Sequence, residues 1–246
     1  MDNKFDPFEK YATTTMLGDL TQSNVDLIVS ESCRYFAEYV LSYLPQDKKA
    51  NILDVGCGYG RYLTALEKSG YINVKGIDIS KDQVAYARNK LGLFNAEVAD
   101  AIHYLEDDDQ KYDAVLLMDV LEHLSVEDSV SLLAKIKQAL RKGGVLIIHV
   151  PNALAPLSVH RYQDVTHQRA YTTASIEQSL RMAGGGFSSI EHVAVVWGVK
   201  SIVRRIIWSL LFNPMIYLYT RIAIGPVNEG IFTNNIMSVA TRDEVI

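Results

Sequence analysis

Asn51-Ile52-Leu53-Asp54-Val55-Gly56-Cys57-Gly58-Tyr59-Gly60-Arg61-Tyr62 is the stretch of sequence around which the chain is organised. Its pattern is that of a short apolar strand, a glycine-rich turn and the start of a helix, expected over 61–69. Glycine at every second position permits a tight turn and leaves no side chains where a ligand must come close. The helix would point its N-terminal amides at that ligand. We therefore expect a nucleotide-type cofactor against this turn; the alternative is that the glycines serve only the turn's geometry.

The spacing of the glycines separates two kinds of cofactor. The dinucleotide fingerprint is G-x-G-x-x-G, whereas this chain has Gly56, Gly58 and Gly60, with Arg61 at the third fingerprint position. That third glycine allows close packing of helix on strand, and Arg61 cannot replace it. Asp54, a carboxylate near the end of the strand, suits a ligand with a cationic or donor-rich end better than a pyrophosphate. The pattern thus argues against a dinucleotide.

Strands and helices alternate after this turn, which predicts a parallel sheet with right-handed crossovers and helices on both faces. The strands are expected at 51–55, 74–79, 96–99, 112–118, 145–150, 187–196 and 232–241. The helices are expected at 24–44, 61–69, 82–90, 126–140 and 173–183. Ser23 or Asn24 is expected to cap the first helix, and the run 141–144 (Arg-Lys-Gly-Gly) to end the fourth.

Two further acidic residues lie at the expected carboxyl ends of strands, where ligands bind in open α/β sheets. Asp78, before Ile79, follows the glycines by about 20 residues, the spacing of an acid that binds ribose hydroxyls. Asp100 could accept the exocyclic amine of an adenine while the Ala101 amide reaches a ring nitrogen. The alternatives are an ordinary helix N-terminal acid at Asp78 and a helix cap at Asp100.

The run Asp119-Val120-Leu121-Glu122-His123 follows the fourth expected strand. Together with D-x-G-x-G-x-G at 54–60, it resembles the motifs of class I S-adenosylmethionine-dependent methyltransferases. The resemblance implies a Rossmann-like α/β sheet of seven strands, ordered 3-2-1-4-5-7-6, with the last strand antiparallel. It implies S-adenosyl-L-methionine as cofactor, with Met118 near its methionine half. Glu122 and His123 are expected either to pack and form hydrogen bonds or to act directly in the active site.

The predicted cofactor-binding residues share the carboxyl ends of the first four strands. They are Asp54, Gly56, Cys57, Gly58, Gly60, Asp78, Ile79, Asp100, Ala101, Met118 and His123.

The stretch from His160 to Tyr171 follows the fifth expected strand and should border the mouth of the cofactor site. A hydroxyl acceptor benefits from a general base, and D-x-x-H places Asp164 and His167 within reach of each other on a turn. We predict His167 as the catalytic base and Asp164 as the residue that orients it. The predicted acceptor contacts are His160, Arg161, Tyr162 and Tyr171.

Two alternatives remain for this stretch. The first is a loop that an Asp–His hydrogen bond merely holds in place. The second is a divalent metal site that uses Asp164, His167 and a third ligand; because only two ligands are visible in the sequence, we predict no metal site here.

The run R-Y-x-D-x-T-H at 161–167 resembles methyltransferases encoded with enzymes of bacterial surface-polysaccharide (O-antigen or capsule) biosynthesis. The resemblance implies O-methylation of a sugar hydroxyl on a glycan, a lipid-linked saccharide or a nucleotide sugar. Methylation of a small molecule or a quinone is the alternative within enzymes. A cofactor-binding partner subunit without turnover is the alternative outside them.

Length and composition set broader limits. With 246 residues, 48% of them apolar, the chain can form a single domain with a sizeable core. We expect an N-terminal helical cap (1–45), a Rossmann-like core (46–196 and 231–242) and a helical insertion (197–230). A net charge of −5 argues against nucleic acid as a partner. Two cysteines and no apolar run at the N-terminus favour a cytoplasmic location without a signal peptide.

The insertion is apolar and aromatic over 199–224, and its charged residues are all basic: Lys200, Arg204, Arg205 and Arg221. Such a composition suits a pair of interfacial helices broken at Pro214, which would contact the inner face of the membrane peripherally. The alternatives are a helical lid and the contact face of a homodimer.

Overall fold

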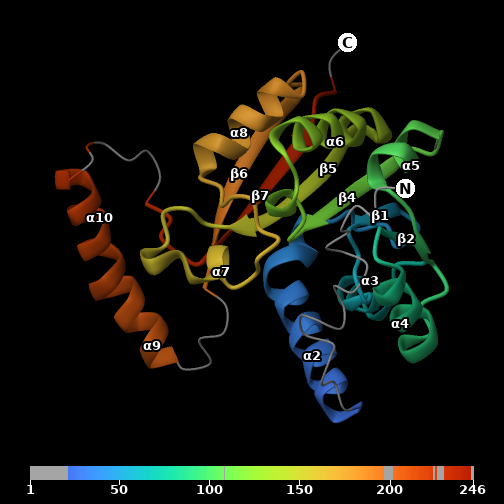
Figure 1. The fold of residues 1–246 in the computed structure, drawn as a ribbon, viewed down its shortest axis with the longest axis horizontal. Coiled ribbons are helices and arrows are strands. Elements are labelled where there is room, and N and C mark those ends of the chain that lie inside the picture. Colours follow the sequence, from blue (N-terminus) through green and yellow to red (C-terminus); the bar gives the residue numbers. More distant parts are fainter. Residues whose placement is uncertain (1–21, 108, 197–201, 224, 226–229, 245–246) are drawn as a thin grey trace, which may run out of the picture.

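The computed structural model describes residues 22–107, 109–196, 202–223, 225 and 230–244. Seven strands form one sheet in the order β3-β2-β1-β4-β5-β7-β6, which confirms the predicted order (Figure 1). The first five strands are parallel, whereas β7 is antiparallel to both of its neighbours. The strands are β1 (Asn51–Val55), β2 (Asn73–Asp78), β3 (Ala96–Val98), β4 (Tyr112–Met118), β5 (Leu140–Pro151), β6 (Phe187–Val195) and β7 (Asn235–Arg242).

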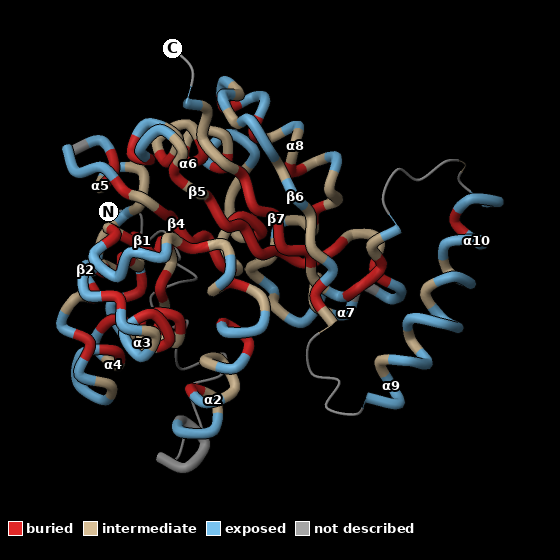
Figure 2. The backbone as a smooth tube through the Cα atoms, turned by 180° about the vertical axis from the view of Figure 1, so that it is seen from behind, coloured by how far each residue is buried: buried red, intermediate tan, exposed pale blue. Residues whose placement is uncertain are grey.

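Helices cover both faces of the sheet (Figure 1). One face carries α2 (Gln22–Tyr35), α3 (Arg61–Lys68) and α4 (Lys81–Leu91), and the other carries α5 (Ala101–Asp107), α6 (Val126–Ala139) and α8 (Thr173–Met182). Successive side chains of a strand point to opposite faces, so Leu116 packs with the first group and Leu117 with the second. The central strands are accordingly buried along most of their length (Figure 2).

The end of α6 differs from the prediction. The helix stops at Ala139, and the run 141–144, expected to be its glycine stop, already belongs to β5. Leu140 is fully buried and pairs with Tyr112 of β4, so β5 begins immediately after the helix. Gly143, at φ 73°, lies within the irregular register that follows. The predicted caps of the first helix are also wrong, because Ser23 and Asn24 lie inside α2.

The connection between β6 and β7 is helical, as predicted, but it is not broken at Pro214. Helix α9 (Ile202–Ile207) runs through a π-helical segment (Trp208–Phe212) into α10 (Asn213–Ala223). Pro214 is the second residue of α10, and a π-type turn just before it can absorb the missing N–H. The pair stands apart from the sheet, beyond the short helix α7 (Val159–Tyr162) (Figures 1 and 2).

Most side chains of this pair are exposed, and it carries no acidic residue over 202–223. Within the described part of the chain, no helix is long and apolar enough to cross a membrane. Residues 199–201 and 224 of the predicted interfacial segment lie outside the described residues.

Asn152 ties the end of β5 to the segment that leads into β7. Its Nδ2 donates to the carbonyls of Ile231 (2.9 Å) and Thr233 (2.8 Å), and its Oδ1 accepts from the Leu154 amide (2.9 Å). Only 1% of the residue is exposed. The side chain thereby fixes the start of the loop that returns over the carboxyl ends of β4 and β5.

Asn152→Ala should lower the free energy of unfolding by about 2–4 kcal/mol, because it leaves two carbonyls and one amide buried without partners. Urea denaturation measures this change. Asn234→Ala, at an exposed position nearby, is the matched control and should change stability by less than about 0.5 kcal/mol. Equal effects of the two substitutions would contradict the role given to Asn152.

Candidate functional site

The turn between β1 and α3 can be built only with glycine. Gly56, Gly58 and Gly60 have φ values of 71°, 56° and 89°, in the left-handed region that disfavours side chains. A Cβ at Gly56 would overlap the side chain of Val120, and one at Gly60 would overlap Leu93. The backbone therefore leaves the sheet in a tight, side-chain-free curve at the carboxyl end of β1, where the sequence predicts the cofactor.

Two carboxylates flank this curve. Asp78, at the end of β2, accepts hydrogen bonds from the amides of Gly58 and Ser80, both at 2.8 Å, and so joins the two strand ends. Asp54 is fully buried, and neither of its carboxylate oxygens has a hydrogen-bond partner among the described residues. Burial raises the pKa of Asp54 to about 8. An isolated buried carboxylate is costly, so this one suits a ligand that brings a cationic group.

The other predicted cofactor residues lie along the same edge. Asp100 precedes α5, and its Oδ1 accepts from the amides of Ile102 and His103, both at 3.0 Å. This is the capping role named as the alternative, and contact with an adenine stays a prediction. The remaining residues line the ends of β1, β2 and β4 or the start of α5: Cys57 and Met118 are buried, Ile79 is exposed, and Ala101 is half-buried.

A partly buried charge network that the sequence did not reveal joins this turn to β4 and β5. Asp119 lies 2.6 Å from Arg61 of α3 and, through its other oxygen, 2.6 Å from Nδ1 of His149 on β5. Burial alone would raise the pKa of Asp119, but His149 and Arg61 outweigh it and hold this pKa below its usual range. Asp119 adopts φ 60°, an unusual value outside glycine. The one feature of the sequence that could have indicated this network is the polar residue His149 within an otherwise apolar strand.

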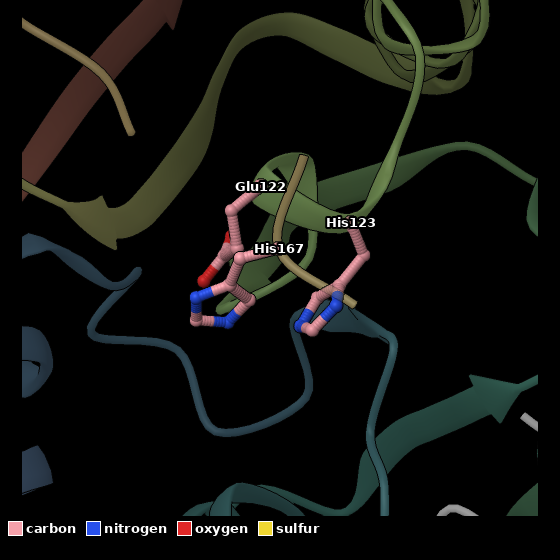
Figure 3. A group of neighbouring side chains, drawn as sticks. All are labelled: Glu122, His123 and His167. Carbon is pink, nitrogen blue, oxygen red and sulfur yellow. The ribbon is translucent and has the colours of Figure 1, made fainter. Parts of the chain in front are cut away.

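A second cluster lies just beyond β4, in the short 3-10 helix η3 (Leu121–His123) and the loop that follows α7. Glu122, His123 and His167 each offer a potential ligand atom, and these atoms all lie within 4.8 Å of one another (Figure 3). The rings of His123 and His167 meet edge to face with centroids 4.6 Å apart. The structure thus brings together residues that are more than forty positions apart in the sequence.

Hydrogen bonds fix the loop against η3. The Gln168 amide donates to the Glu122 carbonyl (2.7 Å), and Nε2 of Gln168 donates to the His123 carbonyl (2.8 Å). His123 Nδ1 lies 2.8 Å from Thr166 Oγ1, which itself donates to Asp164 Oδ1 at 2.6 Å. Burial, followed by the nearby His167, lowers the pKa of His123 to about 4, so this imidazole is neutral near pH 7.

The predicted base, His167, is oriented differently from the expectation. Its Nδ1 lies 3.3 Å from the Arg161 carbonyl, which can only accept, so Nδ1 carries the proton and Nε2 carries the lone pair. The Asp164 carboxylate accepts from the amide and the hydroxyl of Thr166. An orienting effect of Asp164 on His167 stays a prediction, as does the role of His167 itself.

The predicted acceptor contacts fall into two groups. His160, Arg161 and Tyr162 lie on α7, where Tyr162 is exposed and His160 Nδ1 lies 3.0 Å from Asn235 Oδ1. Tyr171 instead is buried, and its hydroxyl donates to the Leu121 carbonyl at 3.2 Å. Tyr171 therefore stabilises η3 through this hydrogen bond. The three residues of α7 are more accessible than Tyr171.

Comparisons with known proteins agree with this geometry. A family model described as a methyltransferase domain matches residues 29–184, and the chain belongs to this family. Ajmaline N-methyltransferase of Rauvolfia serpentina is 32% identical over 151 residues, which cover 58% of this chain and 50% of that protein. Ubiquinone biosynthesis O-methyltransferase of Hydrogenovibrio crunogenus is 34% identical over 113 residues, 44% of each chain. The chain thus spans about half the length of these curated relatives, or less.

The solved structure of a SAM-dependent methyltransferase from Archaeoglobus fulgidus superimposes with a TM-score of 0.65. The match covers 87% of this chain and 94% of that one at 22% identity, a level at which the likeness shows the fold. Family and fold together define a class I S-adenosylmethionine-dependent methyltransferase domain.

The residues present fit that cofactor. Its methionine portion carries an ammonium group and its adenosine carries hydroxyls and an amine. The unpartnered Asp54 carboxylate, the side-chain-free turn and Asp78 beside it offer complementary groups for these. These groups match the cofactor in their chemistry, and they lie together along one edge of the sheet.

Asp54→Asn should change how stability depends on pH in the protein without cofactor. The pKa of Asp54 is raised by folding, from about 4 in an unfolded chain to about 8. Folding then requires proton uptake between these values, so this group's contribution to stability is lost as pH rises. The amide of the variant does not ionise and has no such cost. The free energy of unfolding of the variant should therefore rise relative to that of the wild type, by up to about 1.4 kcal/mol per pH unit between pH 5 and 7.

Urea denaturation at pH 5, 6 and 7 measures this slope. Asp109→Asn, at an exposed position, is the control and should keep the wild-type slope. Parallel pH profiles for Asp54→Asn and the wild type would contradict the isolation of the Asp54 carboxylate.

Proposed function

We propose that the protein is an S-adenosylmethionine-dependent O-methyltransferase that acts on a sugar hydroxyl of a glycan, a lipid-linked saccharide or a nucleotide sugar. The observation that carries the proposal is the position of the run 161–167. Its residues lie against η3, directly after β4, beside the edge of the sheet where the cofactor residues gather. The contacts of Thr166 and His167 with His123 of η3 thus support an acceptor-binding role for the stretch that resembles polysaccharide-associated methyltransferases.

When bound, S-adenosylmethionine supplies a methyl group whose carbon–sulfur bond breaks as the acceptor oxygen bonds to carbon and the hydroxyl proton is lost. The chain has to hold both partners in line and exclude water. We assign the cofactor to Asp54, Asp78, the glycine turn and the start of α5, with Met118 at the methionine end. Met118 is the last residue of β4 and is buried, and in this proposal its side chain helps to exclude water from the methionine end.

Loss of the hydroxyl proton depends, in this proposal, on the cluster around His167. The Arg161 carbonyl holds the proton on Nδ1, so Nε2 is the atom with basic character. The proposed acceptor contacts are His160, Arg161 and Tyr162, since α7 leads directly into the loop of His167; Tyr162 is exposed and the other two are half-buried. Arg161 stacks near the Tyr162 ring, 5.2 Å from its centroid, which provides an aromatic and cationic surface for a sugar.

A small-molecule or quinone-type acceptor is the second candidate. It is supported by the relatives themselves, which include an O-methyltransferase of ubiquinone biosynthesis. The acceptor of an O-methyltransferase loses a proton from oxygen, as a sugar hydroxyl does, so the same cluster would serve a quinone-type acceptor.

Methyl transfer from labelled S-adenosylmethionine onto fractionated extracts tests the proposal. Label is expected in glycolipid or nucleotide-sugar fractions; label confined to quinone fractions supports the second candidate, and no label in any fraction contradicts both. His167→Ala should reduce transfer by roughly 100-fold or more while S-adenosylhomocysteine still binds as in the wild type. Near-normal turnover of this variant would contradict the dependence on His167.

We also propose that α9 and α10 contact an anionic membrane surface peripherally, which would bring the enzyme to a lipid-linked acceptor. Leu210 of the π-helical segment and Leu218 and Ile222 of α10 are among many exposed apolar side chains of this helical stretch. Arg204 and Arg221 are exposed beside them, and no acid lies within 202–223. An apolar, basic helix of this kind favours a headgroup interface.

Flotation with phosphatidylglycerol vesicles tests this contact. The wild type should float, and a variant with Leu210→Glu and Leu218→Glu should stay at the bottom of the gradient. The control carries Ile72→Glu and Phe94→Glu, two equally exposed apolar positions elsewhere, and should float like the wild type. Equal behaviour of all three proteins would remove the membrane contact.

A further inference from the structure

We propose that Glu122, His123 and His167 form a binding site for a divalent transition-metal cation, with coordination positions left open for the hydroxyls of the acceptor. The three ligand atoms lie within 4.8 Å of one another. Two ligands that are each about 2.1 Å from a shared ion in a tetrahedral site are about 3.4 Å apart, so each ligand atom has to shift by less than about 1 Å to close the site. Figure 3 shows the Glu122 carboxylate and the His167 ring side by side, with the His123 ring next to them.

The charge of Glu122 requires a partner that the described residues do not supply. Glu122 is fully buried, and neither carboxylate oxygen has a hydrogen-bond partner within the described part of the chain. Burying an unpaired carboxylate is unfavourable, and the anionic Asp119 lies nearby in the sequence and adds to the cost. A cation between Glu122 and the two imidazoles would offset this cost directly.

Both histidines are held in the way that suits ligation. His123 Nδ1 donates to Thr166 Oγ1 (2.8 Å), and that hydroxyl donates onward to Asp164 Oδ1 (2.6 Å). His167 Nδ1 donates to the Arg161 carbonyl (3.3 Å). In each ring the proton is thus on Nδ1, and the lone pair for a cation is on Nε2. Outer hydrogen bonds of this kind fix the ring orientation of metal-binding histidines.

The backbone also holds the two halves of the site together. Glu122 and His123 come from η3, whereas His167 comes from a loop more than forty residues later. The Gln168 backbone and side chain both donate to η3 carbonyls, at 2.7 Å and 2.8 Å. The relative position of the three ligands is therefore set before any ion binds.

The donor set defines the class of ion and what it would do. Two imidazoles and one carboxylate suit Zn²⁺, Fe²⁺, Co²⁺ or Mn²⁺, and three protein ligands leave at least one position open. A hydroxyl bound to such an ion loses its proton more readily. This inference rests on the proposed function and changes the role of His167 within it: Nε2 binds the cation instead of accepting the proton, and the bound cation promotes loss of the hydroxyl proton. An acceptor with two adjacent hydroxyls could occupy two open positions, a feature that many sugars offer.

Titration with Co²⁺, followed by its visible absorption bands and by calorimetry, tests the site without any acceptor. The wild type should bind one Co²⁺ per chain. His123→Ala, His167→Ala and Glu122→Gln should each weaken binding at least about tenfold, and Thr166→Val by about tenfold through the outer hydrogen bond. His103→Ala, an exposed histidine on α5, should bind like the wild type.

Absence of Co²⁺ binding by the wild type, or binding that the three ligand variants leave unchanged, overturns the inference. S-adenosylhomocysteine affinity, measured in the same variants, verifies that each variant is folded. If a variant does not fold, the Co²⁺ titration of the wild type still tests whether the site exists. Methyl transfer by metal-free protein in EDTA separates the two proposals. Full activity of the metal-free protein overturns the catalytic part of the inference and leaves the proposed function intact. Co²⁺ binding by a protein that labels no acceptor supports the metal site and contradicts the proposed function.

Discussion

The buried turn between β1 and α3 constrains the rest of the structure, since its backbone passes where no side chain fits. Gly56 and Gly60 lie against Val120 and Leu93, which fixes the carboxyl ends of β1 and β4 relative to α4. Asp54 of β1 lies just before this turn and is buried with no hydrogen-bond partner among the described residues, and α3 starts after the turn with Arg61, whose ion pair reaches Asp119. The charged form of Asp54 is destabilised by burial where a cationic ligand group can offset that cost, so stability is given up at a position that suits a ligand.

Much of the fold could be predicted from the sequence because its pattern is regular. Alternating apolar strands and amphipathic helices predicted the sheet, and β4 was placed at its observed residues. The errors arose where tertiary contacts override local signals. A glycine pair after basic residues usually ends a helix, yet here Leu140 already pairs with Tyr112, so the helix ends and β5 begins before the glycines are reached. Pro214 usually breaks a helix, yet a π-helical turn precedes it and the helical path continues.

The glycine turn and the two acids beside it could be predicted from the sequence, whereas the contacts around η3 could not. Asp54, Asp78 and the glycines stand close in sequence to the turn they serve, so spacing reveals them. The contacts of Asp119 with His149 and of His123 with Thr166 join segments about 30 and 43 residues apart. No local pattern indicates such pairs. D-x-x-H suggested a dyad of Asp164 and His167, whereas the Asp164 carboxylate accepts hydrogen bonds from the amide and hydroxyl of Thr166.

Calorimetric titration with S-adenosylhomocysteine tests most directly whether the β1–α3 turn holds a methyl-donor cofactor. The wild type should bind one molecule per chain, and Asp78→Asn should bind at least about tenfold more weakly, since a charge-assisted hydrogen bond is lost. NAD⁺ should neither bind nor compete. Failure of S-adenosylhomocysteine to bind, or its displacement by NAD⁺, would contradict the central claim.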